Sequence, residues 1–214
     1  MRVVLASHNA KKLAELRVLL AGLDGLPLDL QPPGPLGIAE PDEPHPTFVE
    51  NALAKARHAA LAAGAAAIAD DSGLCVAALD GAPGVGSALA AGAVASPPGA
   101  DREALRRVQD AANNAWLLAR MQGVADRRAR FVCTLVALRH AADPEPLVAT
   151  GRWDGEILAS ARGAGGFGYD PLMFVPALGA TVAELAPAQK NLHSHRAQAA
   201  AAMRALMRAA WCGG

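Results

Sequence analysis

Two adjoining stretches decide the fold: residues 47–64 read TFVENALAKARHAALAAG, and residues 66–73 read AAIADDSG. In the first, helix formers follow Thr47, a typical N-cap residue, and end before Gly64, a typical C-cap residue, which predicts a long helix. In the second, a short apolar run predicts a buried strand over 66–69 that ends at the polar cluster Asp70-Asp71-Ser72-Gly73. A helix that leads into a buried strand indicates an α/β chain.

The same alternation of helices and strands continues in both directions along the chain. The other expected strands cover residues 3–6, 130–138, 147–153 and 172–175. The other expected helices cover residues 11–20, 101–121 and 194–211. Asp101 lies near the start of the second of these helices, and Ser194 is expected to cap the third. Residues 30–46 are rich in proline and glycine and are expected to form a loop.

The composition limits the classes of protein to which the chain can belong. Lys and Arg total 20, as do Asp and Glu, so no basic stripe indicates binding to long nucleic acid. Apolar residues make up 52% but aromatic residues only 4%, so the core is expected to consist of small side chains on closely packed helices. No segment resembles a signal peptide or is long enough to span a bilayer, so we expect a soluble, cytoplasmic protein without a membrane partner.

The cysteines are Cys75, Cys133 and Cys212. They lie far apart in the sequence and match no zinc-binding spacing. We therefore expect reduced, packed thiols, as in cytosolic proteins.

The turn between the first strand and the first helix carries polar and basic residues, which read Ser7-His8-Asn9-Ala10-Lys11-Lys12. A strand-to-helix turn points backbone N–H groups and the positive end of the helix dipole at one place, which suits a phosphate group. Lys12 lies one turn into the helix and can reach a neighbouring phosphate. An ordinary N-cap with solvated lysines explains this segment equally well.

Asp70 and Asp71 are adjacent on the predicted strand, so their side chains point to opposite sides. One of them can face a cleft at the carboxyl end of the strand, where ligands of α/β sheets usually bind. There it can hold magnesium or take a proton from water. The alternative is a turn in which both aspartates cap local backbone N–H groups.

The loop before residue 47 carries three carboxylates, Glu40, Asp42 and Glu43. Magnesium commonly uses one or two carboxylates beside substrate phosphates, so a carboxylate from this loop near Asp71 completes such a site. For at least one of the three, a solvated acidic loop is the simpler interpretation.

Two later segments indicate a binding site for a base. In the segment over 165–171, GGFGYDP, glycines flank Phe167 and Tyr169, which allows close backbone approach and presents a ring for stacking. Lys190, His195 and Arg196 gather potential cations around the start of the last helix, where the helix dipole disfavours them. An anionic or carbonyl-rich ligand explains that placement.

In their order, these motifs resemble those of the inosine triphosphate pyrophosphatase family, in its bacterial dITP/XTP pyrophosphatase branch. The matching segments are 7–12, 47–56, 69–74, 81–85, 165–171 and 190–196. The resemblance implies a mixed central β-sheet flanked by helices, in a single two-lobed domain over residues 1–214 with a deep nucleotide cleft. It also implies a homodimeric hydrolase that uses Mg2+ to convert non-standard purine nucleoside triphosphates (ITP, dITP, XTP and dXTP) to the monophosphate and pyrophosphate.

The resemblance further implies a role for each matching residue. Asp71 is the general base that activates water, and the candidate metal ligands are Asp42, Glu43 and Asp71. The residues that hold the triphosphate are Ser7, His8, Asn9, Ala10, Lys11, Lys12 and Lys55. Ser72 also contacts the substrate. Around the base, the implied contacts are stacking by Phe167, lining by Gly168, Tyr169 and Asp170, and edge recognition by Lys190, His195 and Arg196.

One loop departs from the family pattern. After Gly-Ala-Pro-Gly-Val the family usually continues with tyrosine and then Ser-Ala-Arg-Tyr, whereas this chain has Gly86-Ser87-Ala88-Leu89-Ala90. Because of this loop, a catalytically silent nucleotide-binding module stays open as another function. A pyrophosphatase of related fold that acts on pyrimidine or modified triphosphates also stays open. Nucleic-acid binding is a third, which the neutral charge disfavours.

Overall fold

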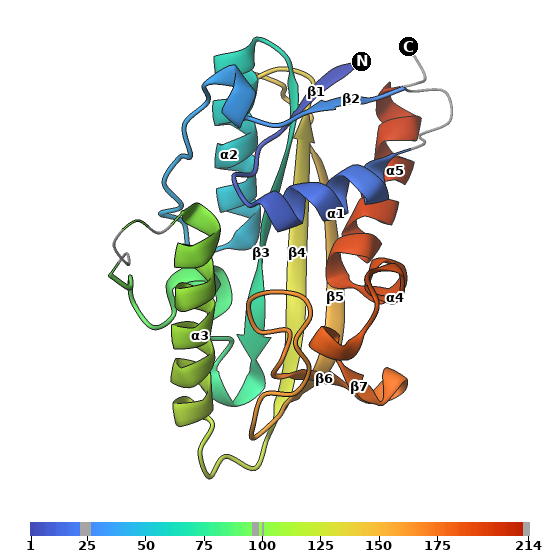
Figure 1. Ribbon diagram of the computed structural model, residues 1–214. Helices are drawn as coiled ribbons and strands as arrows, with labels where there is room; N and C mark the ends of the chain where they lie inside the picture. The colour runs from blue at the N-terminus through green and yellow to red at the C-terminus, as the bar shows by residue number, and fades with distance from the viewer. Residues whose placement is uncertain (22–26, 96–98, 100, 212–214) are drawn as a thin grey trace. The chain divides into compact units, whose positions relative to one another are not determined.

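The computed structural model describes residues 1–21, 27–95, 99 and 101–211, so Cys212 lies outside the described residues. The strands (Figure 1) are β1 (Arg2–Leu5), β2 (Asp29–Gln31), β3 (Ala66–Val76), β4 (Arg128–Leu138), β5 (Leu147–Ile157), β6 (Met173–Val175) and β7 (Ala180–Thr181). The α-helices are α1 (Ala10–Leu20), α2 (Phe48–Ala63), α3 (Arg102–Arg120), α4 (Pro187–His193) and α5 (His195–Trp211). The short 3-10 helices are η1 (Gly34–Leu36), η2 (Ala77–Leu79), η3 (Gly84–Leu89), η4 (Pro176–Leu178) and η5 (Val182–Glu184).

The strands form one mixed sheet flanked by helices, which confirms the predicted fold class. Along the sheet the order is β2-β1-β3-β4-β5-β6-β7. Strand β1 pairs in parallel with β2 and β3, whereas β6 pairs antiparallel with both β5 and β7. Parallel neighbours need crossover connections. Helix α1 connects β1 to β2, and α2 lies between β2 and β3 in the chain.

The chain divides into two compact units. The first unit comprises Met1–Ser72, Val132–Arg152 and Asn191–Gly214, and the second comprises Gly73–Phe131 and Trp153–Lys190. Strands β3, β4 and β5 contribute residues to both units. The predicted single two-lobed domain stays a prediction.

In the first unit, alternate residues of the strands face different helices. Val3, Leu5 and Ile68 pack with buried residues of α1 and α5, whereas Val4 and Ala67 pack with alanines of α2. Helices α1 and α5 also contact each other (Figure 1). Because the side chains of a strand point alternately to its two sides, even-numbered residues of β3 in this unit face α1 and α5, and odd-numbered residues face α2.

The second unit has a core of its own that includes α3. Leu117 and Met121 pack there with the aromatic residues Phe131, Trp153 and Tyr169. In the first unit, by contrast, the hydrophobic residues that α2 buries are all alanines, namely Ala52, Ala56, Ala59 and Ala60. The expected core of small side chains is therefore found on α2, while several of the few aromatic residues pack together in the second unit.

Two predicted strand ends are wrong. The strand expected over 147–153 continues to Ile157, and β3 does not end at Asp70-Asp71-Ser72-Gly73 but continues through this cluster to Val76. The two carboxylates can stay inside a buried strand because each of them is paired with cations, as described below. Gly73 allows close approach to η3, since a Cβ at this position would lie only 2.4 Å from the Gly84 carbonyl oxygen. The aspartates therefore lie within a strand and not at a carboxyl end.

Most other elements agree with the predictions. Thr47, Asp101 and Ser194 accept hydrogen bonds from backbone N–H groups at the starts of α2, α3 and α5. Gly64 ends α2 in the left-handed conformation. Strands β2 and β7 and helix α4 were not predicted, because strands of three and two residues and a helix of seven are too short to show a clear period.

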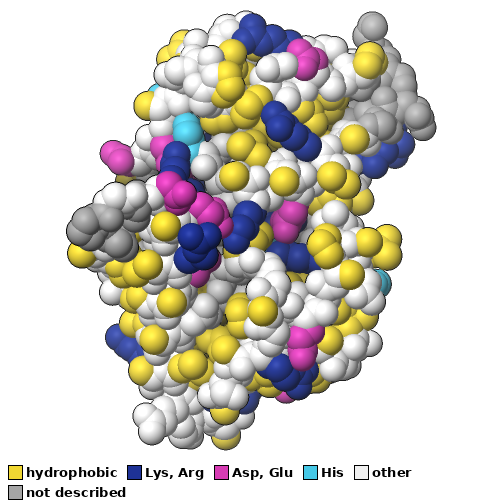
Figure 2. Space-filling view, viewed as in Figure 1, with side chains coloured by type: hydrophobic (Ala, Val, Ile, Leu, Met, Phe, Trp, Pro, Cys, Tyr) yellow, Lys and Arg dark blue, Asp and Glu magenta, His cyan; other side chains and the backbone are white. Residues whose placement is uncertain are grey.

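The face of the molecule shown in Figure 2 carries no single dominant charge. On the face shown in Figure 2, basic and acidic side chains are interspersed, in agreement with the net charge of zero. Within the described part of the chain, no helix combines the length and the apolar character needed to cross a membrane.

Candidate active site

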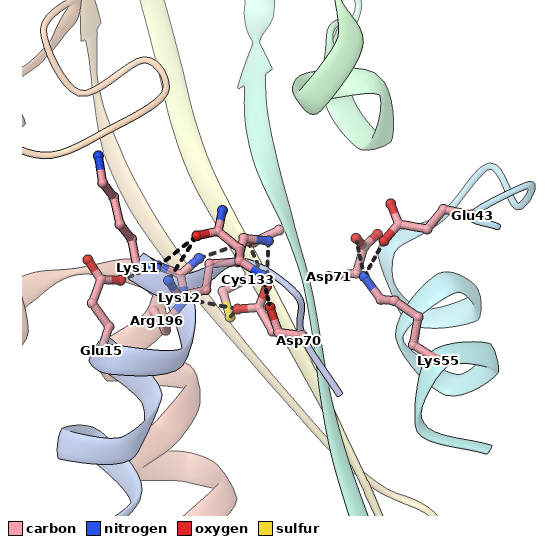
Figure 3. Close-up of polar contacts among 12 residues, drawn as sticks. Lys11, Lys12, Glu15, Glu43, Lys55, Asp70, Asp71, Cys133 and Arg196 are labelled. Carbon is pink, nitrogen blue, oxygen red and sulfur yellow. Dashed lines mark hydrogen bonds and ion pairs between the residues drawn. The ribbon is translucent and has the colours of Figure 1, made fainter. Parts of the chain in front are cut away.

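Asp70 and Asp71 are neighbours on β3, and their side chains point to opposite sides of the strand (Figure 3), as predicted. Both residues are buried, with Asp70 2% exposed and Asp71 4% exposed. A buried carboxylate stays ionised only with charged or hydrogen-bonding partners. The partners of these two carboxylates differ, and so does their chemistry.

Asp70 is held by groups from α1, α5, β4 and its own strand. Its Oδ1 accepts from Lys12 Nζ at 2.8 Å and from Ser72 Oγ at 2.8 Å. Its Oδ2 accepts from Arg196 Nε at 2.9 Å and from Cys133 Sγ at 3.2 Å. Both oxygens of this carboxylate are therefore occupied within the protein.

Arg196 is buried together with Asp70, being 1% exposed. Its Nη1 donates to Glu15 Oε2 at 2.5 Å and its Nη2 donates to Ser72 Oγ at 2.9 Å. Every nitrogen of the guanidinium thus has a partner in the first unit. The group thus joins α5 to β3 and α1, and the predicted role of Arg196 in reading a base edge stays a prediction. His195, the first residue of α5, is also buried.

The surrounding charges fix the ionisation of this cluster. Burial alone raises the pKa of the Asp70 carboxyl, but the charges of Arg196 and Lys12 outweigh burial and hold this pKa well below its usual value. Burial raises the pKa of the Cys133 thiol well above its usual value, and the nearby Asp70 charge raises it further. Asp70 is therefore an ionised acceptor and Cys133 a neutral donor, as in a structural ion-pair network.

Asp71 faces α2 and shares one ammonium with Glu43 (Figure 3). Lys55 Nζ donates to Asp71 Oδ1 at 3.0 Å and to Glu43 Oε1 at 2.6 Å. The other oxygen of Asp71, Oδ2, is buried and has no hydrogen-bond partner among the described residues. Two carboxylates around one ammonium leave a negative charge, and one acceptor of Asp71 remains for a ligand.

The pKa of Asp71 is raised above its ordinary value. Burial is the main cause and the Glu43 carboxylate adds to it, whereas the charges of Lys55 and Lys12 act in the opposite direction. For Lys55, burial lowers the pKa, but Asp71 and Glu43 outweigh burial and raise it. A buried carboxyl group with a raised pKa is typical of acid–base groups in active sites. Asp71 therefore combines a raised pKa with a buried oxygen that has no hydrogen-bond partner among the described residues, whereas Asp70 has a lowered pKa and two bonded oxygens.

The structure brings together two of the three predicted metal ligands. Glu43 and Asp71 bind the same ammonium, whereas Asp42, which is exposed as Glu43 is, does not take part in this pairing. Over the described ranges, no three or more His, Cys, Asp or Glu side chains lie close enough to hold a metal ion. At this point the described residues therefore provide two carboxylates and not a complete set of metal ligands.

The turn before α1 is a capped helix start, as the alternative interpretation predicted. Asn9 Oδ1 accepts from the backbone N–H groups of Lys11 at 3.0 Å and Lys12 at 3.2 Å. Those two N–H groups are therefore bonded and do not point freely at a ligand. Ser7 Oγ accepts from the backbone N–H of Asn9 at 3.3 Å, and His8 Nε2 lies 2.8 Å from a backbone carbonyl oxygen.

The basic side chains at this helix start differ in their surroundings. Ala10 begins α1, and in Figure 3 the Lys11 side chain points away from Asp70. Lys12 pairs with Asp70, and its charge also lowers the pKa of Asp71. Lys12 and Lys55 therefore act electrostatically on both aspartates, one from α1 and the other from α2.

In the second unit, the glycine-rich loop presents Phe167 and buries Tyr169. The Phe167 ring is partly exposed, and the Lys190 ammonium lies 4.4 Å from its centroid. Asp170 Oδ2 accepts from Lys190 Nζ at 2.8 Å and from the Phe167 backbone N–H at 2.9 Å. Tyr169 is 4% exposed and donates its hydroxyl to the Ser87 carbonyl oxygen at 2.9 Å. Phe167, Asp170 and Lys190 thus lie together, whereas the Tyr169 ring belongs to the core.

Two residues of the aspartate clusters were not predicted, Glu15 and Cys133. Glu15 lies three residues after Lys12, so helical spacing alone places both on one face of α1. Cys133 shares a side of β4 with Leu135, which faces α1 and α5. Their partners are 181 and 63 residues away in the sequence, so no local pattern reveals these contacts.

Comparisons with known proteins agree on one family. The model of the Ham1 family matches residues 3–206. The chain is 68% identical over 211 residues to the dITP/XTP pyrophosphatase of Methylibium petroleiphilum, which covers 99% of both chains. It is 57% identical over 202 residues to the dITP/XTP pyrophosphatase of Burkholderia pseudomallei, which covers 94% of this chain and 91% of the relative.

A solved structure leads to the same result. The HAM1 protein from Coxiella burnetii has a TM-score of 0.85 at 40% identity, and the match covers 98% of this chain and 100% of that chain. The fold and these matches identify a hydrolase that acts on nucleotides. The chain belongs to the Ham1 family.

Proposed function

We propose that the chain hydrolyses non-standard purine nucleoside triphosphates, dITP and ITP together with XTP and dXTP, to the nucleoside monophosphate and pyrophosphate. Its role is then to clear these compounds from the nucleotide pool. Family membership supports this function, since the relatives named above are dITP/XTP pyrophosphatases. The observation that carries it is the buried Asp71 carboxylate, which has a raised pKa and, among the described residues, no protein partner for Oδ2.

In the proposed reaction, a water molecule attacks the α-phosphorus and Asp71 accepts its proton. The bond between the α-phosphorus and the oxygen that bridges to the β-phosphate breaks, and pyrophosphate leaves with the bonding electrons. A general base functions best when its pKa lies near the working pH, and the raised pKa of Asp71 moves it in that direction. Asp70 has a depressed pKa and two occupied oxygens, so it is the poorer base.

Glu43 and Asp71 are the residues that would hold a divalent metal ion, which we propose to be Mg2+. This ion is usually bound by one or two carboxylates and by substrate phosphates. The pair fits that description, because both carboxylates bind one ammonium and Asp71 Oδ2 has no partner within the described part of the chain. When bound, the ion neutralises negative charge on the phosphates and on the departing pyrophosphate.

Lys12 and Lys55 are the proposed main contacts of the triphosphate. Both ammonium groups are paired with aspartates in the structure, so each has to share or exchange a carboxylate for phosphate oxygens when the nucleotide binds. Ser72 is a further proposed substrate contact. The other proposed contacts lie in the turn before α1 and at its start, namely Ser7, His8, Asn9, Ala10 and Lys11.

For the base, we propose stacking on Phe167 and an edge contact from Lys190. Hypoxanthine and xanthine carry a carbonyl group at position 6, which accepts a hydrogen bond from a cationic donor. Adenine has an amino group there, so two donors face each other unpaired. A site that depends on one required hydrogen bond can discriminate by about 10⁴-fold or more. His195 and Arg196 are further proposed contacts of the base edge. The Arg196 nitrogens are bonded in the first unit, so Arg196 has to share or exchange a partner when the base binds, as Lys12 and Lys55 do for phosphate.

The assembly and cellular location form part of the proposal. We expect a homodimer in the cytoplasm. Light scattering on the purified protein tests the dimer, and a monomeric mass would contradict it. Fractionation of cells tests the location.

The function is tested by pyrophosphate release from ITP, XTP, ATP, GTP and pyrimidine triphosphates, with and without Mg2+. We expect metal-dependent release from ITP and XTP that exceeds release from ATP by orders of magnitude. A preference for pyrimidine triphosphates would replace the proposal by the related pyrophosphatase. Nucleotide binding without pyrophosphate release would identify the silent binding module instead.

A further inference from the structure

Helix α3 holds one residue of the glycine-rich loop with two side chains. The backbone N–H of Gly168 donates to Asp110 Oδ2 at 2.9 Å, and the carbonyl oxygen of Gly168 accepts from Asn114 Nδ2 at 2.9 Å. Asp110 and Asn114 are four residues apart on α3, so they lie on the same face of the helix. Both polar backbone groups of Gly168 are therefore bonded to side chains of one helix.

Gly168 is a turning point of this loop. Its φ of 60° lies in the left-handed region, which glycine adopts without steric cost. Phe167 precedes it, and Tyr169 follows with its hydroxyl anchored to the Ser87 carbonyl oxygen. Because Phe167 and Gly168 share a peptide bond, the position of the Phe167 ring depends on where α3 holds Gly168.

A second anchor acts on Phe167 from the other direction along the loop. The backbone N–H of Phe167 donates to Asp170, which also binds the Lys190 ammonium. The same ammonium lies over the Phe167 ring. The position of the Phe167 ring is therefore determined by its contacts with Asp170 and Lys190. It is also determined by the hydrogen bonds between α3 and Gly168.

The asparagine in this arrangement is not explained by stability alone. Asn114 Nδ2 also donates to the backbone carbonyl oxygen of Asp110 at 2.9 Å, so both neighbours of this nitrogen are acceptors and the amide has one orientation. Asn114 Oδ1 is buried and has no hydrogen-bond partner in the described residues. Burying an unbonded oxygen opposes folding. The hydrogen bond that Asn114 donates to Gly168 therefore explains the presence of this asparagine better than its burial does.

We infer that Asp110 and Asn114 are positioning residues for the substrate base: they hold Gly168 so that Phe167 stands where it stacks on the purine. The inference rests on the proposed function, in which Phe167 is the stacking ring. Neither side chain has a part in the proposed chemistry at the phosphates. Their loss should therefore weaken nucleotide binding without slowing the chemical step.

Steady-state kinetics with ITP and Mg2+ test this inference on the whole chain. In Asp110→Ala and in Asn114→Ala, KM should rise about three- to tenfold for the loss of a hydrogen bond, with kcat within about twofold of wild type. Asp110→Asn keeps an oxygen that can accept from Gly168, so its KM should stay within about twofold of wild type. In the double alanine variant, KM should rise by less than the product of the two single effects, because both side chains act on one residue.

Leu118→Ala is the matched control on the same helix. Leu118 packs, partly buried, against the core of the second unit, so its truncation removes side-chain packing of α3 without removing a bond to Gly168. Hydrogen exchange at the Gly168 amide provides a readout that does not depend on activity. Exchange should become faster in Asp110→Ala, and should be unchanged in Asp110→Asn and in Leu118→Ala.

An unchanged KM in both alanine variants would overturn the inference, even if exchange at Gly168 became faster. An equal rise of KM in Leu118→Ala would overturn it as well, because the effect would then belong to the helix as a whole. Failure of the proposed function looks different: the wild-type protein itself would then release no pyrophosphate from ITP, while the exchange pattern of Gly168 would be as predicted.

Discussion

Asparagine substitutions at the adjacent positions Asp70 and Asp71 should have different effects. Asp70→Asn should lower the stability of the fold, and Asp71→Asn should lower the catalytic rate. Asp70→Asn removes the charge that faces Arg196, and the two side chains are 0% and 2% exposed. Removing one partner of a buried ion pair costs about 3–5 kcal/mol, and the lower end applies because Glu15 still pairs with Arg196. In a chain of this length, a loss of about 3 kcal/mol lowers Tm by about 6–12 °C.

Asp71→Asn should have the opposite profile. Lys55 keeps its ion pair with Glu43, and the variant removes a carboxylate whose charge is disfavoured by burial. Tm should therefore stay the same or rise. The kcat for ITP should fall at least about 100-fold, which is the lower range for a lost acid–base group.

Thermal unfolding and pyrophosphate release, measured on both variants and on Asp126→Asn, test this contrast. Asp126 forms a surface ion pair with Arg128, and their side chains are 39% and 78% exposed, so this control should match wild type in both assays. The reasoning is refuted if the Tm of Asp70→Asn lies within about 1 °C of that of wild type. A loss of about 3 kcal/mol in the free energy of unfolding lowers Tm by more than that. Equal losses of stability in Asp70→Asn and Asp71→Asn would refute it too.

Further predictions concern pH, stacking and thiol reactivity. The folded-state pKa of Asp70 is depressed, so its contribution to stability is complete above the unfolded pKa and is lost as pH falls toward the folded pKa. Acid titration of unfolding should thus show a steeper loss below about pH 4 in wild type than in Asp70→Asn, and parallel curves would contradict this. Phe167→Ala should raise KM for ITP roughly 5- to 150-fold, as expected for one lost base–aromatic stack, whereas Phe167→Tyr should retain most of the affinity. Cys133 should resist alkylation in the native protein because it is buried and its thiol pKa is raised. Mass spectrometry checks this, and labelling as fast as in the unfolded chain would disprove it.

The parts of the fold that were predictable are those that local chemistry determines. Helix α2 follows from the Thr47 cap, the run of helix formers and the Gly64 cap, all of which lie within one segment. The length of β3 was not predictable in the same way. Two adjacent carboxylates are a turn signal unless cations pair with them, and the cations that pair with Asp70 lie 58 and 126 residues away in the sequence.

The site shows the same limit. Alternation along a strand placed Asp70 and Asp71 on opposite sides, but it did not say which side carries the structural ion pairs. That assignment depends on Ile68 and Asp70 sharing the face covered by α1 and α5. The cations at the start of α5 indicated an anionic or carbonyl-rich ligand, and the family resemblance implied a base-edge contact for Arg196. The partners turned out to be the protein's own carboxylates, which helix-dipole reasoning alone cannot distinguish from a ligand.

Incorporation of ¹⁸O from labelled water during ITP hydrolysis tests the central claim most directly. Attack on the α-phosphorus with Asp71 as the base predicts label in the inosine monophosphate, unlabelled pyrophosphate, and incorporation that slows in Asp71→Asn together with pyrophosphate release. Label in the pyrophosphate, or orthophosphate as the first product, would contradict the account.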